Sequence, residues 1–409
     1  MNNNQKFLVA LLSYSIRNKP FCDNIDYTIN WDEVFIEAKK QNVAQLIYPL
    51  ITELDTNIQP DSSICEKWRY LTLLVGLIQT TYISNAKSLF QEICDAGIPI
   101  IALKGLVLRE LYPHPELRSM SDFDILVQKE DIEKAKLLLV SLGYSYKKDY
   151  DSKEIHFYHK SNILIELHWR LTVPGYIKNA DVFENRVWKN SVEYSIFDFP
   201  IRVLSINDQI IHLCLHMVFH LYDSGINLRM LCDLVLFVEN NFGKIDWDEL
   251  IRYAEELNIT KFMLSMLVVC NKLLNMKLPD IPIGVEYSEK SINKFIADIF
   301  DHVNNEEEKI ENKNVNQLLK NFSGEEKYYR NKVKLYLKIL FPSYKGLTKN
   351  YSYIYKRPYL YPIAWWQHLI KSIFSSSTRS QINQRFKFDK QTYNRYKEKL
   401  DMLKGLGIR

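Results

Sequence analysis

The chain has 409 residues, of which 47% are apolar and 25% charged, proportions that are ordinary for a globular protein of two or three domains. Its 12 glycines are few, which argues against a glycine-rich phosphate-binding loop of the P-loop or dinucleotide-binding kind. The net charge of +4 is too small to identify a partner from the electrostatics of the whole chain.

The six cysteines are scattered without a Cys-x-x-Cys pair, so they predict reduced thiols and neither a disulfide framework nor a zinc site. The N-terminal apolar run, Phe7–Leu12, is too short for a signal peptide. The longest apolar run elsewhere, Phe262–Cys270, is far below the roughly 20 residues that cross a bilayer. We therefore expect a cytoplasmic protein without a transmembrane segment.

Residues 1–92 are predicted to form an N-terminal helical region. Asn30 is the expected N-cap of a helix that starts at Trp31, because apolar residues follow it at helical spacing. The same period continues over Trp68–Cys94 and stops before Gly97.

Strands and helices are then predicted to alternate, which is typical of an α/β unit. The apolar run Ile98–Leu103 has the pattern of a buried strand, ended by Lys104 and Gly105, and Leu106–Tyr112 has that of a short helix stopped by prolines. Further predicted elements are a strand at Asp122–Gln128, a helix at Glu130–Leu142 followed by Gly143, and strands at Tyr144–Tyr146, Ile155–His159 and Ile163–Leu171.

The helical period returns at Ile206 and lasts to Asn275. The polar stretch Asp280–Ser323 is predicted to be a solvated linker or a surface helix. The C-terminal part is basic and aromatic, with 14 Lys or Arg against 3 Asp or Glu from Phe341 to Arg409.

An Asp-x-Asp pair is the first chemical signal. In a strand, Asp122 and Asp124 project to one side while Phe123 and Ile125 face a core. Two neighbouring carboxylates repel each other unless a cation lies between them, and Mg²⁺ prefers oxygen ligands. An isolated Asp-x-Asp is more often a surface turn, so the pair needs further support.

Glu166 gives that support. Alternation places it on one face of a strand together with His168, while apolar side chains take the other face. A lone acid in an apolar strand is costly unless something compensates its charge, and a metal shared with Asp122 and Asp124 would do so. Three carboxylates have room for two metal ions, the arrangement that activates a hydroxyl and stabilises a leaving pyrophosphate.

The order of strand, Lys-Gly turn, short helix, Asp-x-Asp strand and lone glutamate resembles the nucleotidyltransferase superfamily of the polymerase β type. It is most similar to the superfamily's uncharacterised bacterial branch. The matching residues are Leu103-Lys104-Gly105, Leu111-Tyr112-Pro113, Arg118, Ser121–Val127, Gly143-Tyr144 and Ile165–Trp169. The resemblance covers about residues 96–172 well. A looser similarity continues through His216, His220, Arg229, Asp233 and Phe341-Pro342-Ser343.

The resemblance implies an α+β fold, with a small mixed-sheet nucleotidyltransferase core flanked by N-terminal and C-terminal helical regions. The predicted domains are 1–92 (helical), 93–203 (core), 204–330 (helical) and 331–409 (basic aromatic segment).

The resemblance also implies site roles. Asp122, Asp124 and Glu166 would be the catalytic acids and the ligands of Mg²⁺ or Mn²⁺. The implied nucleotide-binding residues are Lys104, Gly105, Arg109, Arg118 and Ser121. Gly105, without a Cβ, would let the backbone and the following helix N-terminus approach the phosphates. Leu106 stands where the simplest members carry serine, and Lys104 would supply what that serine does.

Several side chains keep two interpretations. Arg118 would clamp a triphosphate through its planar fork, or pair with a nearby acid, and we favour the first. His168 would orient a metal ligand or touch the acceptor, or be a buried hydrogen-bonded histidine. Arg229 and Asp233, four residues apart, are expected to form a pair on the helix surface. In the alternative interpretation, they border the cleft.

His212, His216 and His220 recur every four residues and so share one helix face. The absence of HExxH favours core or supporting histidines over a zinc site. His216 and His220 would reach the substrate if their helix packs over the catalytic strands.

The leading hypothesis is a nucleotidyltransferase that moves a nucleoside monophosphate from ATP or another nucleoside triphosphate to an acceptor hydroxyl. The alternatives are a catalytically silent nucleotide-binding or regulatory partner, and an ATP-dependent phosphotransferase. The acceptor stays open among RNA, protein, small molecule and saccharide. The segment 341–409 would contact a polyanion or a membrane surface peripherally, or dock on the body as a helix.

Overall fold

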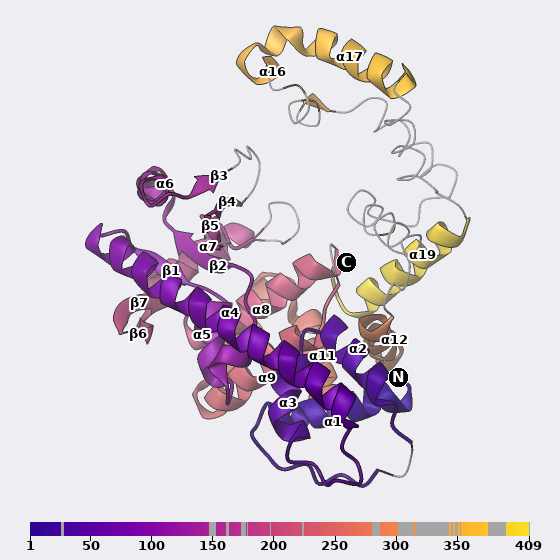
Figure 1. Ribbon diagram of the computed structural model, residues 1–409. Helices are drawn as coiled ribbons and strands as arrows, with labels where there is room; N and C mark the ends of the chain where they lie inside the picture. Colours follow the sequence, from indigo (N-terminus) through magenta and orange to yellow (C-terminus); the bar gives the residue numbers. More distant parts are fainter. Residues whose placement is uncertain are drawn as a thin grey trace. The chain divides into compact units, whose positions relative to one another are not determined.

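The protein is described from a computed structural model of residues 1–409 (Figure 1). The description omits residues 26–27, 147–152, 161–162, 173–176, 178, 197, 223–224, 280–286, 302–314, 316–342, 345–346, 348–350, 352, 375–389 and 409. Two compact units are present. The first comprises Met1–His220, Gly225–Phe300 and Gly405–Arg409, and the second comprises Leu221–Ser224 and Asp301–Lys404. The finer four-part division stays a prediction.

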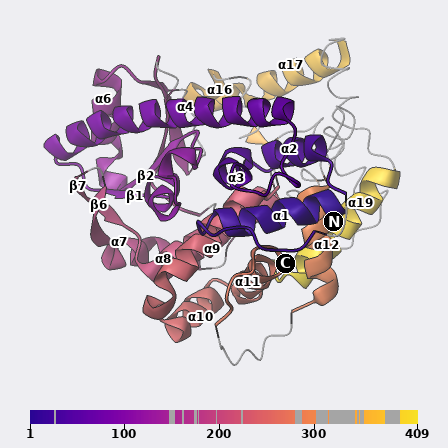
Figure 2. The same ribbon diagram turned by 60° about the horizontal axis from the view of Figure 1, so that its bottom comes forward.

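Four helices open the first unit: α1 (Asn3–Ser15), α2 (Trp31–Lys40), α3 (Ala44–Ile51) and α4 (Ser62–Asp95). The Asn30 side chain accepts a hydrogen bond from the Glu33 N–H, which confirms the predicted N-cap of α2. In Figures 1 and 2, α4 extends from the other N-terminal helices to the sheet. It begins earlier than the predicted Trp68, because Asp61 caps its first turn.

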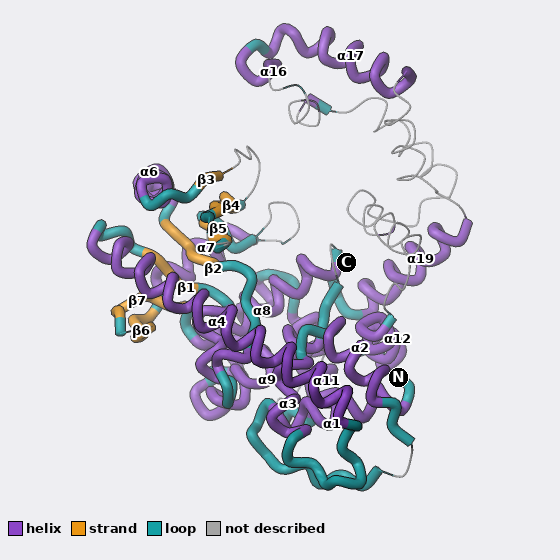
Figure 3. Tube along the Cα trace, viewed as in Figure 1, coloured by secondary structure: helices purple, strands orange, loops and turns teal. Residues whose placement is uncertain are grey.

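One mixed sheet of seven strands follows, in the order β3-β4-β5-β2-β1-β7-β6 (Figure 3). The strands are β1 (Ile100–Ala102), β2 (Phe123–Val127), β3 (Ser145–Tyr146), β4 (Glu154–Tyr158), β5 (Leu164–His168), β6 (Val192–Ile196) and β7 (Phe199–Val203). The pairs β2–β5 and β1–β7 are parallel and the other pairs are antiparallel. The predicted mixed-sheet α+β fold is confirmed.

Helices lie in the connections from β1 to β2, from β2 to β3 and from β5 to β6. They are α5 (Gly105–Leu108), η1 (Arg109–Leu111), η2 (Pro115–Leu117), η3 (Lys129–Asp131), α6 (Ile132–Ser141) and α7 (Ala180–Asn190). Gly143 has φ +88° after α6, the left-handed conformation that glycine adopts without strain.

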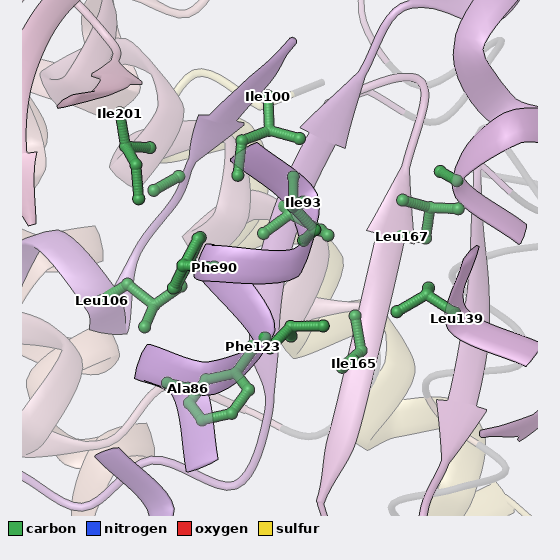
Figure 4. Close-up of a cluster of buried hydrophobic side chains, with 14 of the residues drawn as sticks. Ala86, Phe90, Ile93, Ile100, Leu106, Phe123, Leu139, Ile165, Leu167 and Ile201 are labelled. Carbon is green, nitrogen blue, oxygen red and sulfur yellow. The ribbon is translucent and has the colours of Figure 1, made fainter. Parts of the chain in front are cut away.

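The apolar face of the sheet packs on α4. Figure 4 shows Ala86, Phe90 and Ile93 of this helix beside Phe123 and Ile165 of the central strands. The alternation predicted for β2 and β5 is therefore correct, because their apolar residues enter this core and the other face is left for polar side chains.

The hairpin β6–β7 and the helix α7 were not predicted. Four of the five residues of β6 are exposed, so this edge strand lacks the buried alternation by which a strand is recognised. Pro200 in β7 also weakens a strand pattern. The strand β1 spans only three residues of the predicted Ile98–Leu103 run.

Helices form the rest of the first unit. As the periodicity predicted, α8 (Ile206–Leu221), α9 (Leu228–Asn241), η4 (Phe242–Lys244), α10 (Trp247–Glu256) and α11 (Thr260–Leu274) cover the stretch up to Asn275. The helix α12 (Glu289–Phe300) lies in the stretch predicted to be a linker or a surface helix. Most of the predicted linker 280–323 and the residues Phe341-Pro342 lie outside the described residues. No helix in the described ranges is long and apolar enough to cross a membrane.

The second unit contains α16 (Tyr353–Lys356), η5 (Pro358–Leu360), α17 (Tyr361–Phe374) and most of α19 (Lys390–Gly405). Leu347, Ile354 and Ala364 form a small core there, against which aromatic residues pack. The described parts of the basic aromatic segment are thus partly helical.

Two polar side chains of α4 hold the backbone around β2 and β5. Gln79 pairs with Met120, accepting from its N–H and donating to its carbonyl, both at 3.0 Å. The Tyr82 hydroxyl donates to the Ser121 carbonyl at 2.7 Å and accepts from the Leu164 N–H at 3.2 Å. The starts of two strands that are distant in sequence are thereby fixed by one helix.

Replacing Tyr82 with phenylalanine should therefore lower the free energy of unfolding by about 1–3 kcal/mol, because two backbone groups lose their partner. Urea denaturation measures this loss. Tyr70→Phe on the same helix is the matched control, since Tyr70 is 71% exposed. Equal losses in the two variants would contradict the anchoring role.

Candidate active site

The polar face of the sheet is centred on Asp124, whose side chain is 3% exposed. The Lys104 ammonium donates to its Oδ1 at 2.7 Å, and His168 Nε2 lies 2.9 Å from the same oxygen. The parallel register of β2 and β5 aligns Asp124 with Glu166. Alternation thus brings Asp124, Glu166 and His168 together as the sequence predicted.

These contacts set the charges of the cluster. Burial alone would raise the pKa of Asp124, but Lys104 and His168 outweigh it and hold that pKa well below its ordinary value. Burial alone would lower the pKa of His168, but hydrogen bonds with Asp124, Glu154 and Glu166 raise it to about 9. His168 is therefore a cation at neutral pH.

A second polar row lies on β4. The antiparallel register aligns His156 with Glu166 and Glu154 with His168. His168 Nδ1 lies 2.9 Å from Glu154 Oε2. Sequence reasoning missed Glu154 and His156. Their signal was the alternation with Phe157, which is fully buried on the apolar face.

Asp122 lies just before β2 and is half-buried. Burial is the largest cause that raises its pKa to about 6, and the Asp124 carboxylate adds to it while Lys104 opposes it. Among the described residues, the metal-ligating atoms form two groups, each within 4.8 Å: Asp124 with Glu166 and His168, and Glu154 with His156 and Glu166. Asp122 belongs to neither group.

The donor chemistry suits a divalent ion, since the first group offers two of the three predicted carboxylates. That Asp122, Asp124 and Glu166 bind metal stays a prediction.

The Lys-Gly turn has an unusual backbone. Lys104 has φ +45° and ψ −117°, which is strained for a residue with a Cβ, and its side chain is tied to Asp124. Gly105 is buried, and an added Cβ would collide with Arg118 Nη1 and lie 2.6 Å from Met120 Sδ. A larger residue here would therefore displace the Met120 side chain and the Arg118 side chain that is paired with Asp233. The helix that follows has only four residues.

Arg118 forms a buried pair with Asp233 of α9. Its Nη2 donates to Asp233 Oδ2 at 2.7 Å and its Nε to Oδ1 at 3.2 Å. Tyr112 donates to the same carboxylate at 2.7 Å, and Arg229 does so at 3.4 Å. The structure places Arg118 in the acid pair that was the alternative to a phosphate clamp. The expected pair of Arg229 and Asp233 is present, but Asp233 is 4% exposed, so its predicted place on the helix surface is wrong.

The other predicted nucleotide-binding residues are separate from this pair. Arg109 is 6% exposed, with Nη1 3.9 Å from a Glu110 carboxylate oxygen, and burial lowers its pKa. Ser121 is exposed. Their contact with a nucleotide stays a prediction.

The helix α8 presents its imidazoles near this cluster. Burial lowers the pKa of His212 and of His216 well below the ordinary value, and the charge of Lys104 is the next cause for both. Neither ring nitrogen of His212 has a hydrogen-bond partner among the described residues. His216 and His220 approach each other at 3.1 Å between their Nε2 atoms.

A family model described as "Uncharacterised nucleotidyltransferase" matches residues 27–275, which is more than half of the chain. The chain belongs to this nucleotidyltransferase family. It is therefore a transferase, and its sheet and flanking helices are the described parts of a nucleotidyltransferase fold.

Two other comparisons add little. The curated proteins contain no match to the chain. A solution structure of the antibiotic-resistance factor ANT(2'')-Ia is similar over 43% of this chain and 95% of that one, with 12% identity and a TM-score of 0.31. A similarity of that size carries no argument about this nucleotidyltransferase.

The buried pair of Arg118 and Asp233 gives a stability prediction. Asp233→Asn should lower the free energy of unfolding by roughly 3–5 kcal/mol in urea titrations, because it leaves a buried guanidinium without its counter-charge. Asp95→Asn, at the exposed end of α4, is the control and should change it by less than about 0.5 kcal/mol.

The effect of Asp233→Asn should depend on pH. Burial opposes ionisation of Asp233, but Arg118 and Arg229 hold its pKa below the ordinary value. The stabilisation is therefore complete above about pH 4 and is lost as the pH falls through the folded-state pKa. The two unfolding curves should converge in acid, and a constant gap would contradict the pair.

Proposed function

We propose that this nucleotidyltransferase moves a nucleoside monophosphate from a nucleoside triphosphate to an acceptor hydroxyl in a reaction that needs Mg²⁺ or Mn²⁺. The observation that supports this best is the register of β2 and β5, which aligns Asp124 with Glu166 while Asp122 lies one residue before β2. Carboxylates on adjacent strands are the donor set that a hard divalent ion takes.

In this proposal Asp122, Asp124 and Glu166 hold the metal. A bound divalent ion would neutralise the charge that develops on the phosphate oxygens. The acceptor oxygen forms a bond to the α-phosphorus, the bond to pyrophosphate breaks, and Glu166 takes the proton of the acceptor hydroxyl.

Lys104 is the cation best placed for the donor phosphates. Its ammonium is paired with Asp124. Burial of the side chain lowers the pKa of Lys104, but the charges of Asp124, Glu166 and Asp122 outweigh burial and raise that pKa. Arg229 also contributes, because its charge acts on Asp122. In contrast, Arg118 is committed to Asp233 and supports the turn from behind Gly105.

The proposed acceptor is a hydroxyl on RNA, protein, a small molecule or a saccharide. A triphosphate donor would place the reaction in the cytoplasm. The segment 341–409 stays a proposed contact with a polyanion or a membrane surface, supported by its excess of basic residues.

Asp122→Asn should abolish transfer, with a loss of at least about 10²-fold, while the fold is kept. Asp122 is a better choice than Asp124, because Asp124 also holds Lys104 and His168 and its replacement would disturb the structure. Labelled triphosphate incubated with a cell extract measures the transfer. Equal labelling by the wild-type and Asp122→Asn proteins would refute the assignment.

A thermal-shift titration should separate the enzyme from a silent binding protein. An enzyme should be stabilised by a triphosphate only when Mg²⁺ or Mn²⁺ is present, by an increment that grows with ligand concentration.

The position of the label on the product distinguishes nucleotidyl transfer from phosphoryl transfer. Retention of the α-phosphate on the product is expected, and retention of the γ-phosphate would show a phosphotransferase instead.

A further inference from the structure

Three potential ligand atoms converge on the outer part of the polar sheet face. His156 Nε2 lies 3.4 Å from Glu154 Oε1 and 3.6 Å from Glu166 Oε1. All three residues offer a ligand atom within 4.8 Å of the others. The two strands β4 and β5 fix this arrangement, because His156 and Glu166 are directly paired across the ladder.

One oxygen of each glutamate, Oε2, lies near a ring nitrogen of His168. The other oxygen of each, Oε1, faces His156. His168 Nδ1 is 2.9 Å from Glu154 Oε2, and His168 Nε2 is 3.4 Å from Glu166 Oε2. Lys153 Nζ is 3.0 Å from the same Glu154 oxygen. The His168 side chain is 1% exposed and lies against both glutamates, so it limits their movement, the kind of support that orients metal ligands.

We propose that Glu154, His156 and Glu166 form a binding site for a transition-metal ion of the zinc class, distinct from the Asp122–Asp124 side of the sheet. A tetrahedral ion with ligands at about 2.1 Å has them about 3.4 Å apart, close to the observed separations. An imidazole beside two carboxylates favours Zn²⁺ or Co²⁺ over Mg²⁺ or Ca²⁺.

The site is open to an ion from solution, because the His156 side chain is 43% exposed. Three protein ligands leave a fourth position free for water or a substrate atom, as in catalytic metal sites. Glu166 would offer only Oε1 to this ion, because its Oε2 faces His168 on the Asp124 side.

A second observation points to a ligand at this face. His212 is 4% exposed, and neither ring nitrogen has a partner among the described residues. After burial, the charges of Lys104 and Lys153 are the largest influences on its pKa, and Asp124 and His168 also contribute, so the imidazole faces the polar side of the sheet on which the proposed ligands lie. A buried polar group of this kind usually has a partner, which a ligand on the polar face can supply.

Cobalt titration of the full chain tests the site, with Mg²⁺ in excess to occupy the oxygen-only positions. The wild type should develop the visible absorption of Co²⁺ bound by an imidazole, with one equivalent, and Zn²⁺ should abolish it. His156→Ala should weaken cobalt binding by at least about 10-fold.

The matched control is His114→Ala. His114 is 47% exposed and lies 3.7 Å from a Glu116 carboxylate oxygen, so it is a similar histidine–glutamate pair away from the sheet. This variant should bind cobalt as the wild type does. Glu154→Gln, checked for folding by circular dichroism, should weaken binding as His156→Ala does.

The inference is overturned if the wild type shows no cobalt absorption, or if His156→Ala and Glu154→Gln keep it unchanged. Its failure is separable from that of the proposed reaction. Asp122→Asn should bind cobalt normally because Asp122 is outside the site, so cobalt binding without any nucleotidyl transfer would leave the site standing and remove only the reaction.

Discussion

Four carboxylates share one face of a small sheet, and the molecule must compensate their mutual repulsion. Asp122, Asp124, Glu154 and Glu166 are brought together by the pairing of β4, β5 and β2. The compensating cations come from different places in the chain: Lys104 from the end of β1, His168 from the same strand as Glu166, and Lys153 from the residue before β4. The cluster is therefore largely balanced by the protein itself.

The rest of the first unit keeps this balanced cluster in place. On the apolar side, α4 packs its side chains into the sheet and hydrogen-bonds to the backbone before β2 and at the start of β5. On the loop side, the ion pair of Arg118 and Asp233 joins the segment before the Asp-x-Asp pair to α9. A surface ion pair contributes little, but a buried pair of this kind is costly to break.

Local pattern was enough to predict some of this site and not the rest. Alternation in β2 and β5 identified Asp124, Glu166 and His168, because a polar residue inside an apolar strand is conspicuous by itself. Glu154 and His156 were missed because most of their strand is only half-buried, where polar residues are ordinary, and only the pairing with β5 places them beside Glu166 and His168. The partner of Arg118 is 115 residues away, a distance over which no local periodicity carries information. The resemblance predicted the family, which the match over residues 27–275 confirmed, but it pointed to none of these contacts.

The turn at Lys104 links backbone energy to charge. Its positive φ is held in part by the ammonium's bond to Asp124, so the conformation of the turn and the occupancy of that bond are not independent. A ligand that draws the Lys104 ammonium away from Asp124 also removes a restraint on the strained backbone of Lys104. The first residues of α5 can then change conformation more readily. The lysine therefore couples the state of the acidic cluster to the end of β1 before it and to the short helix α5 after it.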